Sequence, residues 1–155
     1  VASDERFPDP ADGGWRWMVI AAAATTYGVL LLGSIVHNLY FAGWPLQADA
    51  VIPDLSNRHA ALHFAHRMVA GLGFAYLVFL AGRARKLARP ERLLLTAAAS
   101  AFAVNVGLGA VHVFTEVTSA AVVALHLLFA TVAWATTVAA AAVASGWNRK
   151  RSTTT

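Results

Sequence analysis

The chain has 155 residues, of which 58% are hydrophobic and 13% are charged. An ordinary soluble domain carries about 25% charged residues, so this composition excludes one and indicates a protein that lies mainly in lipid. The formal net charge of +4 does not indicate a nucleic-acid partner, because the basic residues lie between apolar stretches, where they mark one side of a membrane.

Four apolar stretches follow one another, each long enough for the roughly 20 helical residues that cross a bilayer. They run from about 15 to 36, 59 to 82, 92 to 114 and 119 to 147. The predicted fold class is an all-α membrane protein, a four-transmembrane-helix bundle made of two helical hairpins. Residues 15–147 then form one transmembrane domain, and residues 1–14 and 148–155 are expected to be short cytoplasmic tails.

The charges in the connections predict the orientation. Basic residues gather at the turn between the second and third stretches and after the fourth: Arg83, Arg85, Lys86, Arg89, Arg92, Arg149, Lys150 and Arg151. The other two connections contain the carboxylates of Asp49, Asp54 and Glu116. Because cytoplasmic loops carry an excess of Lys and Arg, we expect both termini in the cytoplasm of a multi-pass protein of the cell membrane.

All six histidines lie near the outer ends of the predicted spans: His37, His59, His63, His66, His112 and His126. Ionisable residues inside a membrane are costly and commonly mark a functional site. The sequence therefore predicts a histidine-rich site toward the outer face.

Two of these histidines are predicted to meet at one depth in the membrane. His66 and His126 each lie seven residues after the expected start of their span, which places both about 10 Å along their helices. The second and fourth spans run in the same direction, so the two imidazoles can face each other. Neutral imidazole is a good ligand for iron, and two of them would fill the axial positions of a heme. We expect His66 and His126 to be these heme iron ligands.

Other residues are expected to surround this heme. Arg67 directly follows His66, and Arg58 stands at the start of the second span. A charged side chain in a bilayer is costly unless it is paired or reaches the surface, so we expect both arginines to bind heme propionates, with a lipid-phosphate anchor as the alternative for Arg58. His37 and His112 complete the predicted cofactor-binding set.

The chain contains no cysteine, which excludes covalent heme attachment, disulfides and thiolate metal sites. Any heme is therefore held non-covalently, by coordination and packing.

A weak internal repeat accompanies the hairpins. Gly33–His37 near the end of the first span is similar to Gly109–His112 near the end of the third, and Ala61-Leu-His63 is similar to Ala124-Leu-His126. Each hairpin therefore brings histidines to its outer end.

These residues together resemble one four-helix half of the heme A synthase family. The resemblance is carried by Gly33–His37 through Gly43–Leu46, by His63-Phe-Ala-His66-Arg67 and by Val122-Val-Ala-Leu-His126. It implies heme ligation by His66 and His126. It also implies oxidation of the C8 methyl group of heme O to the formyl group of heme A, for terminal oxidase assembly.

The chain departs from the family pattern in two places. His63 stands where the family usually has a glutamate thought to take part in the chemistry, and the first outer loop lacks the cysteine pair of many members. Histidine titrates near neutrality, so His63 is a candidate catalytic proton acceptor in place of the glutamate, with Glu116 as the alternative carboxylate.

Three functions remain open from the sequence. The leading hypothesis is a heme A synthase-like protein that assembles as a homo-oligomer or within a larger membrane complex. The second is a non-catalytic bis-histidine b-type cytochrome or accessory subunit of a respiratory membrane complex. The third is a copper or zinc site formed by His37, His59, His63 and His112.

Overall fold

The computed structural model describes residues 13–37, 52–87, 89–114 and 118–146. The described part consists of four α-helices without a strand: α1 Gly13–His37, α2 Arg58–Ala84, α3 Arg89–Phe114 and α4 Ala120–Ala144. Each helix is long and apolar enough to cross a membrane. The predicted fold, an all-α membrane protein with four transmembrane helices, is confirmed.

The helix boundaries agree with the predicted ones to within a few residues, and local side-chain chemistry explains where they fall. Asn57 caps α2, because its side chain accepts hydrogen bonds from the backbone N–H groups of His59 and Ala60. The largest differences are at the start of α3, which was predicted at residue 92 but begins at Arg89, and at the end of α4, which was predicted to reach residue 147 but ends at Ala144. Gly146 adopts a φ of 75°, a left-handed conformation that stops a helix and favours glycine.

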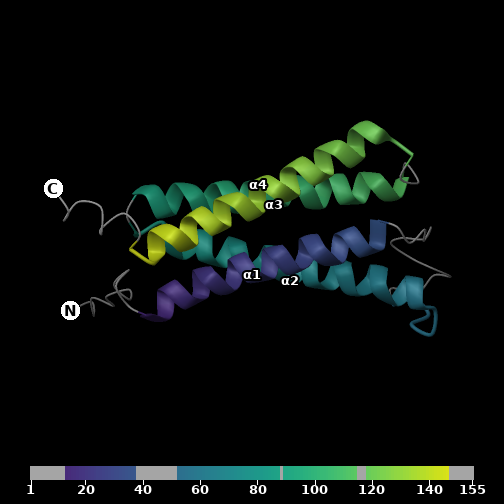
Figure 1. The fold of residues 1–155 in the computed structure, drawn as a ribbon, viewed down its shortest axis with the longest axis horizontal. Helices are drawn as coiled ribbons and strands as arrows, with labels where there is room; N and C mark the ends of the chain where they lie inside the picture. The colour runs from purple at the N-terminus through teal and green to yellow at the C-terminus, as the bar shows by residue number, and fades with distance from the viewer. Residues whose placement is uncertain (1–12, 38–51, 88, 115–117, 147–155) are drawn as a thin grey trace, which may run out of the picture.

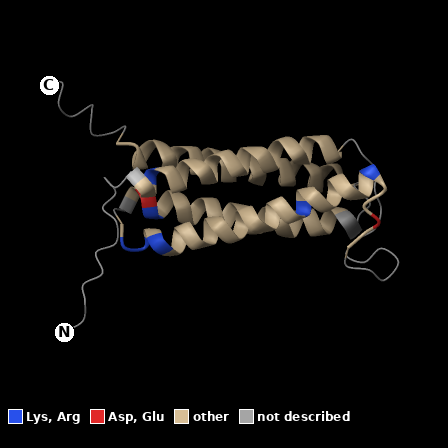
Figure 2. Cartoon of the chain, turned by 90° about the horizontal axis from the view of Figure 1, so that it is seen from below, with Lys and Arg blue, Asp and Glu red and all other residues tan. Residues whose placement is uncertain are grey.

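The helices pack in a closed ring in which each has two neighbours. Helix α1 packs against α2 and α4, and α3 packs against the same two helices. Consequently α1 lies diagonally opposite α3, and α2 lies diagonally opposite α4. Figure 1 shows the resulting elongated bundle of antiparallel neighbours. The bundle has a long middle without Lys, Arg, Asp or Glu, and these charged residues gather toward its two ends (Figure 2).

The buried residues form a regular seam along each helix, with spacings that alternate between three and four. This is the pattern of helices that interlock at a narrow apolar stripe. In α1 the seam comprises Trp15, Val19, Ala22, Thr26 and Val29. In α3 it comprises Glu91, Leu95, Ala98, Phe102 and Asn105. In α2 and α4 it comprises Gly73, Leu77, Leu80 and Ala84, and Ala133, Thr137, Ala140 and Ala144.

The seam shows that the two hairpins are structural repeats. Each seam position of α1 matches the one 76 residues later in α3, as Trp15 matches Glu91. Each seam position of α2 matches the one 60 residues later in α4, as Gly73 matches Ala133. By this register His66 is equivalent to His126. The short Ala-Leu-His similarity, in which His63 aligns with His126, does not follow this buried register.

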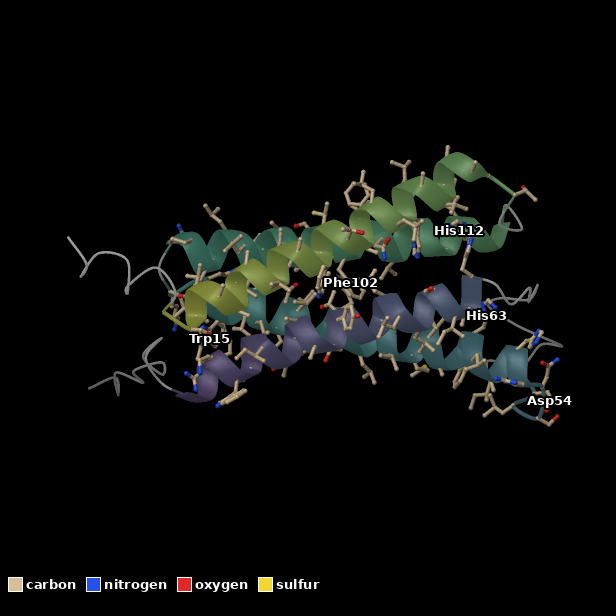
Figure 3. All side chains as sticks on the ribbon, viewed as in Figure 1. Trp15, Asp54, His63, Phe102 and His112 are labelled. Atoms are coloured by element: carbon tan, nitrogen blue, oxygen red, sulfur yellow. The ribbon has the colours of Figure 1, made fainter. Side chains whose placement is uncertain are left out.

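The packed core lies in the half of the bundle away from the histidines. There Trp15 Nε1 donates a hydrogen bond of 3.4 Å to Glu91 Oε1 across the diagonal of the ring, and Phe74 and Phe102 stack farther along with ring centroids 6.0 Å apart. Figure 3 places Trp15 at this end and Phe102 near the middle of the bundle. In the other half Ala60 and Val36 are buried, but no described side chain is buried in residues 61–72, 106–112 or 120–132. The other half is thus thinly packed, and we call it the histidine half.

Candidate functional site

The histidines of α2, α3 and α4 occupy positions that the buried seam would fill with core residues. Continued past its last packed layer at the same spacing, the seam reaches Gly33 in α1, His66 in α2, Gly109 in α3 and His126 in α4. These four residues form one layer, which we call the histidine layer. The helical repeat that packs leucine and alanine in one half of the bundle therefore turns two imidazoles inward in the other.

Each of these two imidazoles lies close against a glycine of the neighbouring helix. A Cβ atom placed on Gly33 would lie 3.1 Å from His66 Cε1, and one placed on Gly109 would lie 3.3 Å from His126 Cε1. Both separations are shorter than the about 3.5–4.0 Å of an optimal carbon contact. The absence of a side chain at the two glycines lets each ring rest against the backbone of the preceding helix. The two hairpins thus build the same arrangement of one glycine and one histidine.

The ring of His126 is held as ligating histidines commonly are. Its Nδ1 lies 3.2 Å from the backbone oxygen of Asn105. A carbonyl oxygen only accepts hydrogen bonds, so this contact requires the tautomer that has its proton on Nδ1. The lone pair is then on Nε2, where it can bind a metal, and the backbone bond fixes the orientation of the ring.

The ring of His66 contains a buried nitrogen without a hydrogen-bond partner among the described residues. That atom is Nδ1. Buried polar atoms are nearly always paired, so this nitrogen indicates that the histidine layer is built to receive a further group.

Several other predicted residues surround this layer. His126, His63 and Arg67 lie close enough to His66 to act on it electrostatically. The rings of His112 and His126 meet edge to face with centroids 5.0 Å apart, and His37 acts electrostatically on both. Figure 3 shows His63 and His112 at the same end of the bundle on opposite hairpins.

The structure does not bring every candidate residue into this group. Arg58 and His59 are exposed at the start of α2, which is the mouth of the histidine half and not its interior. Glu116 lies outside the described residues, so its predicted catalytic role stays a prediction.

The donor set fits a heme better than a compact metal ion. Among the residues that the structure describes, no three His, Asp or Glu side chains come together as a metal-binding group. A copper or zinc site of the kind considered for His37, His59, His63 and His112 needs three or four protein ligands, so it gains no support. A heme brings four nitrogen ligands of its own and takes only two from the protein. Two inward imidazoles, an unpaired ring nitrogen and a thinly packed half of the bundle fit that requirement.

Sequence reasoning missed three residues of this site in their actual roles. Gly33 and Gly109 were noted only as part of a repeat, and Asn105 was not noted at all. The signal was present in the three-four spacing of the seam, because continuing along the chain from Phe102 by three and then four residues reaches Asn105 and Gly109. An apolar membrane helix hides this stripe, since its lipid-facing residues are as hydrophobic as its core.

Comparison with known proteins gives one family. A sequence model of the COX15-CtaA family, described as cytochrome oxidase assembly protein, matches residues 3–138. The match extends over α1, α2, α3 and most of α4. No curated protein and no solved structure matches the chain.

Proposed function

The chain belongs to the COX15-CtaA family of cytochrome oxidase assembly proteins, and from this we propose that it is a heme A synthase-like membrane protein that holds a heme between His66 and His126. The family places the chain in cytochrome oxidase assembly. Oxidation of the C8 methyl group of heme O toward heme A is the specific activity that we propose within that role.

The observation that carries the proposal is the histidine layer. His66 and His126 come from diagonally opposed helices that run in the same direction, and each rests on a glycine of the preceding helix. One pair of repeated hairpins thereby supplies two equivalent imidazoles to one place. A bis-histidine site for a non-covalent b-type or o-type heme needs these elements and no cysteine.

The protein residues have distinct proposed roles around this group. His66 and His126 would hold the heme iron, and the hydrogen bond from His126 Nδ1 to the Asn105 backbone oxygen keeps the His126 ring oriented. When bound, the heme supplies the redox chemistry.

Side chains near the mouth are proposed to bind the propionates of this heme and to move protons. Arg67 and Arg58 are placed to bind propionate groups through charge-assisted hydrogen bonds. His63, one helical turn before His66, is the proposed proton acceptor in place of the family glutamate. His37 and His112 complete the polar lining of the histidine half.

The orientation and assembly of the protein follow from the same reasoning. The bundle end that carries Arg83, Arg85, Lys86 and Arg92 is proposed to face the cytoplasm, which places the histidine half toward the outer face of the cell membrane. Each helix buries less than a third of its membrane-spanning window inside the bundle, so a homo-oligomer or a larger membrane complex has helix surface available for assembly.

Absorption spectra of the detergent-purified protein, oxidised and reduced, test the heme site. We expect a six-coordinate low-spin spectrum, with pyridine hemochrome analysis identifying the heme. His66→Ala and His126→Ala are each expected to abolish that spectrum, whereas the matched control His59→Ala removes an exposed histidine and is expected to keep it. Retention of the spectrum in both ligand variants would reject the proposed pair.

Turnover tests the activity separately. The purified protein, supplied with an electron acceptor, is expected to convert heme O to an alcohol or aldehyde product detectable by mass spectrometry. Absence of any product from protein with intact heme would favour the non-catalytic bis-histidine cytochrome or accessory subunit, which the family match by itself does not favour.

A further inference from the structure

Asn105 has a buried polar atom to which the proposed function gives no role. Its side chain is 7% exposed, and its Oδ1 has no hydrogen-bond partner among the described residues. A buried carbonyl oxygen without a hydrogen bond destabilises the folded protein. An unpaired amide oxygen near the middle of a membrane bundle therefore indicates a donor that binds there.

The position of Asn105 shows which ligand can provide that donor. The seam places it in the layer directly below the histidine layer, together with Val29, Ala70 and Ala130. Its own backbone oxygen accepts the hydrogen bond from His126. The side-chain amide therefore lies next to the proposed iron ligands, on the side that faces the packed half of the bundle.

The amide breaks the symmetry of the two hairpins. The residue equivalent to Asn105 in the first hairpin is Val29, which has no polar side-chain atom. Each hairpin contributes one histidine and one glycine to the proposed iron site, so these features are present twice. A polar group present only once is suited to recognise something that is also one-sided, such as one substituent on the edge of a porphyrin.

The charge of a heme decides which edge reaches Asn105. Propionates are anionic, and the proposed site places them at the mouth beside Arg67 and Arg58. The opposite edge of the porphyrin then faces the layer that contains Asn105. On that edge heme O has a hydroxyl-bearing carbon in its prenylated substituent, whereas protoheme has a vinyl group. A hydroxyl is the donor that Oδ1 lacks.

We propose that Asn105 is a specificity-determining residue that selects a hydroxyl-bearing heme by accepting a hydrogen bond from that hydroxyl through Oδ1. This inference rests on the proposed heme site. It adds a basis for choosing between heme O and its vinyl-bearing precursor, because a site that pairs with a substrate hydroxyl discriminates against the analogue without one.

Two synthetic hemes isolate the hydroxyl from the prenyl chain. Hematoheme has hydroxyethyl groups where protoheme has vinyl groups, and mesoheme has ethyl groups at the same places. The dissociation constants of both are measured by absorption titration of the full purified chain, in the wild type, in Asn105→Leu and in Thr137→Val. Thr137 is a matched control, because it is a buried polar seam residue whose hydroxyl bonds the Ala133 backbone oxygen within α4.

The expected result is a change in the ratio of the two affinities. The preference for hematoheme over mesoheme should fall by about tenfold in Asn105→Leu and stay at the wild-type value in Thr137→Val. The backbone bond to His126 is unaffected by the side-chain substitution, so the six-coordinate spectrum should persist. Asn105→Ala, which leaves no oversized side chain, is the second variant and should lose the preference in the same way.

Each of the other possible results would contradict either the specificity role of Asn105 or the proposed heme site. An unchanged ratio in a folded Asn105 variant means that the amide holds an ordered water only, and it overturns the specificity role alone. The same holds if the wild type shows no preference for hematoheme beyond that expected from the partition of the two hemes into detergent. A wild type that binds neither heme with a six-coordinate spectrum overturns the proposed function and this inference with it.

Discussion

Substitution of Gly33 by alanine tests the packing of the site directly. The added Cβ would lie 3.1 Å from His66 Cε1, and since an optimal carbon contact is about 3.5–4.0 Å, the ring must move by about 0.4 Å or more. An iron ligand held at a fixed bond length tolerates such a shift poorly. Overpacking of this kind costs about 1–3 kcal/mol, which corresponds to a heme affinity weaker by about fivefold to 150-fold.

Two other glycines of the bundle provide the comparison, Gly28 as a control and Gly109 as a milder case. A Cβ on Gly28, also in α1, would have nothing within 4 Å, and a Cβ on Gly109 would lie 3.3 Å from His126 Cε1. Heme titration should therefore rank the losses of affinity as Gly33→Ala largest, Gly109→Ala smaller and Gly28→Ala absent. Alanine also favours the helix by about 0.5–1 kcal/mol, so Gly28→Ala should unfold at an equal or higher temperature. Equal heme affinity and identical spectra in Gly33→Ala and Gly28→Ala would refute the claim that the His66 ring is positioned by this glycine.

Three further predictions concern the ends of the bundle. Trp15→Phe removes the indole donor to the buried Glu91 side chain and should destabilise the bundle by about 1–3 kcal/mol. The loss should appear as a lower midpoint of thermal or denaturant unfolding in detergent. An unchanged midpoint would show that the hydrogen bond contributes nothing to stability. Gly146→Ala places a side chain at a φ of 75° and should destabilise the end of α4 by about 1–2 kcal/mol. Amide exchange in the last turn of α4 should then be faster than in the wild type, and an equal exchange rate would contradict the prediction. Hydrogen bonds from the Ser56 side chain and backbone lower the pKa of Asp54 below its usual 3.8. The turn before α2 should therefore be ordered above pH 3.8 and lose this order as the pH falls through the lowered pKa. An amide exchange rate at Ser56 that does not change on acidification would argue against this prediction.

The sequence predicted the parts of the fold that depend on hydropathy and length. The four spans follow from apolar runs of sufficient length, and the parallel direction of α2 and α4 follows from their order alone. The depth of His66 and His126 followed from counting residues along each span. These features require no knowledge of how any helix is rotated.

The parts that were missed depend on rotation and register. The contacts of Gly33 with His66 and of Gly109 with His126 depend on which face of each helix turns inward. In a helix that is apolar all round, hydropathy does not mark that face. The similarity of Ala61-Leu-His63 to Ala124-Leu-His126 likewise does not follow the buried stripe, which matches His66 to His126.

Some candidate residues were only partly placed. His63, Arg67, His112 and His37 lie around the histidine layer, and their expected parts in heme binding and catalysis stay predictions. Arg58 lies at the mouth in an exposed position, where its expected part in propionate binding stays a prediction. Long charged side chains at a membrane surface have many conformations of similar energy, so sequence alone gives their location and not their partner.

The uneven packing of the bundle sets an order of events during biogenesis. Leu77, Leu80 and Leu95 are fully buried in the half that contains no histidine, so helix association there needs no prosthetic group. The chain is thereby able to insert and fold before any heme arrives. With the heme site that we propose, maturation would amount to filling the histidine half, and the supply of heme, rather than the folding of the polypeptide, would set when the protein becomes complete.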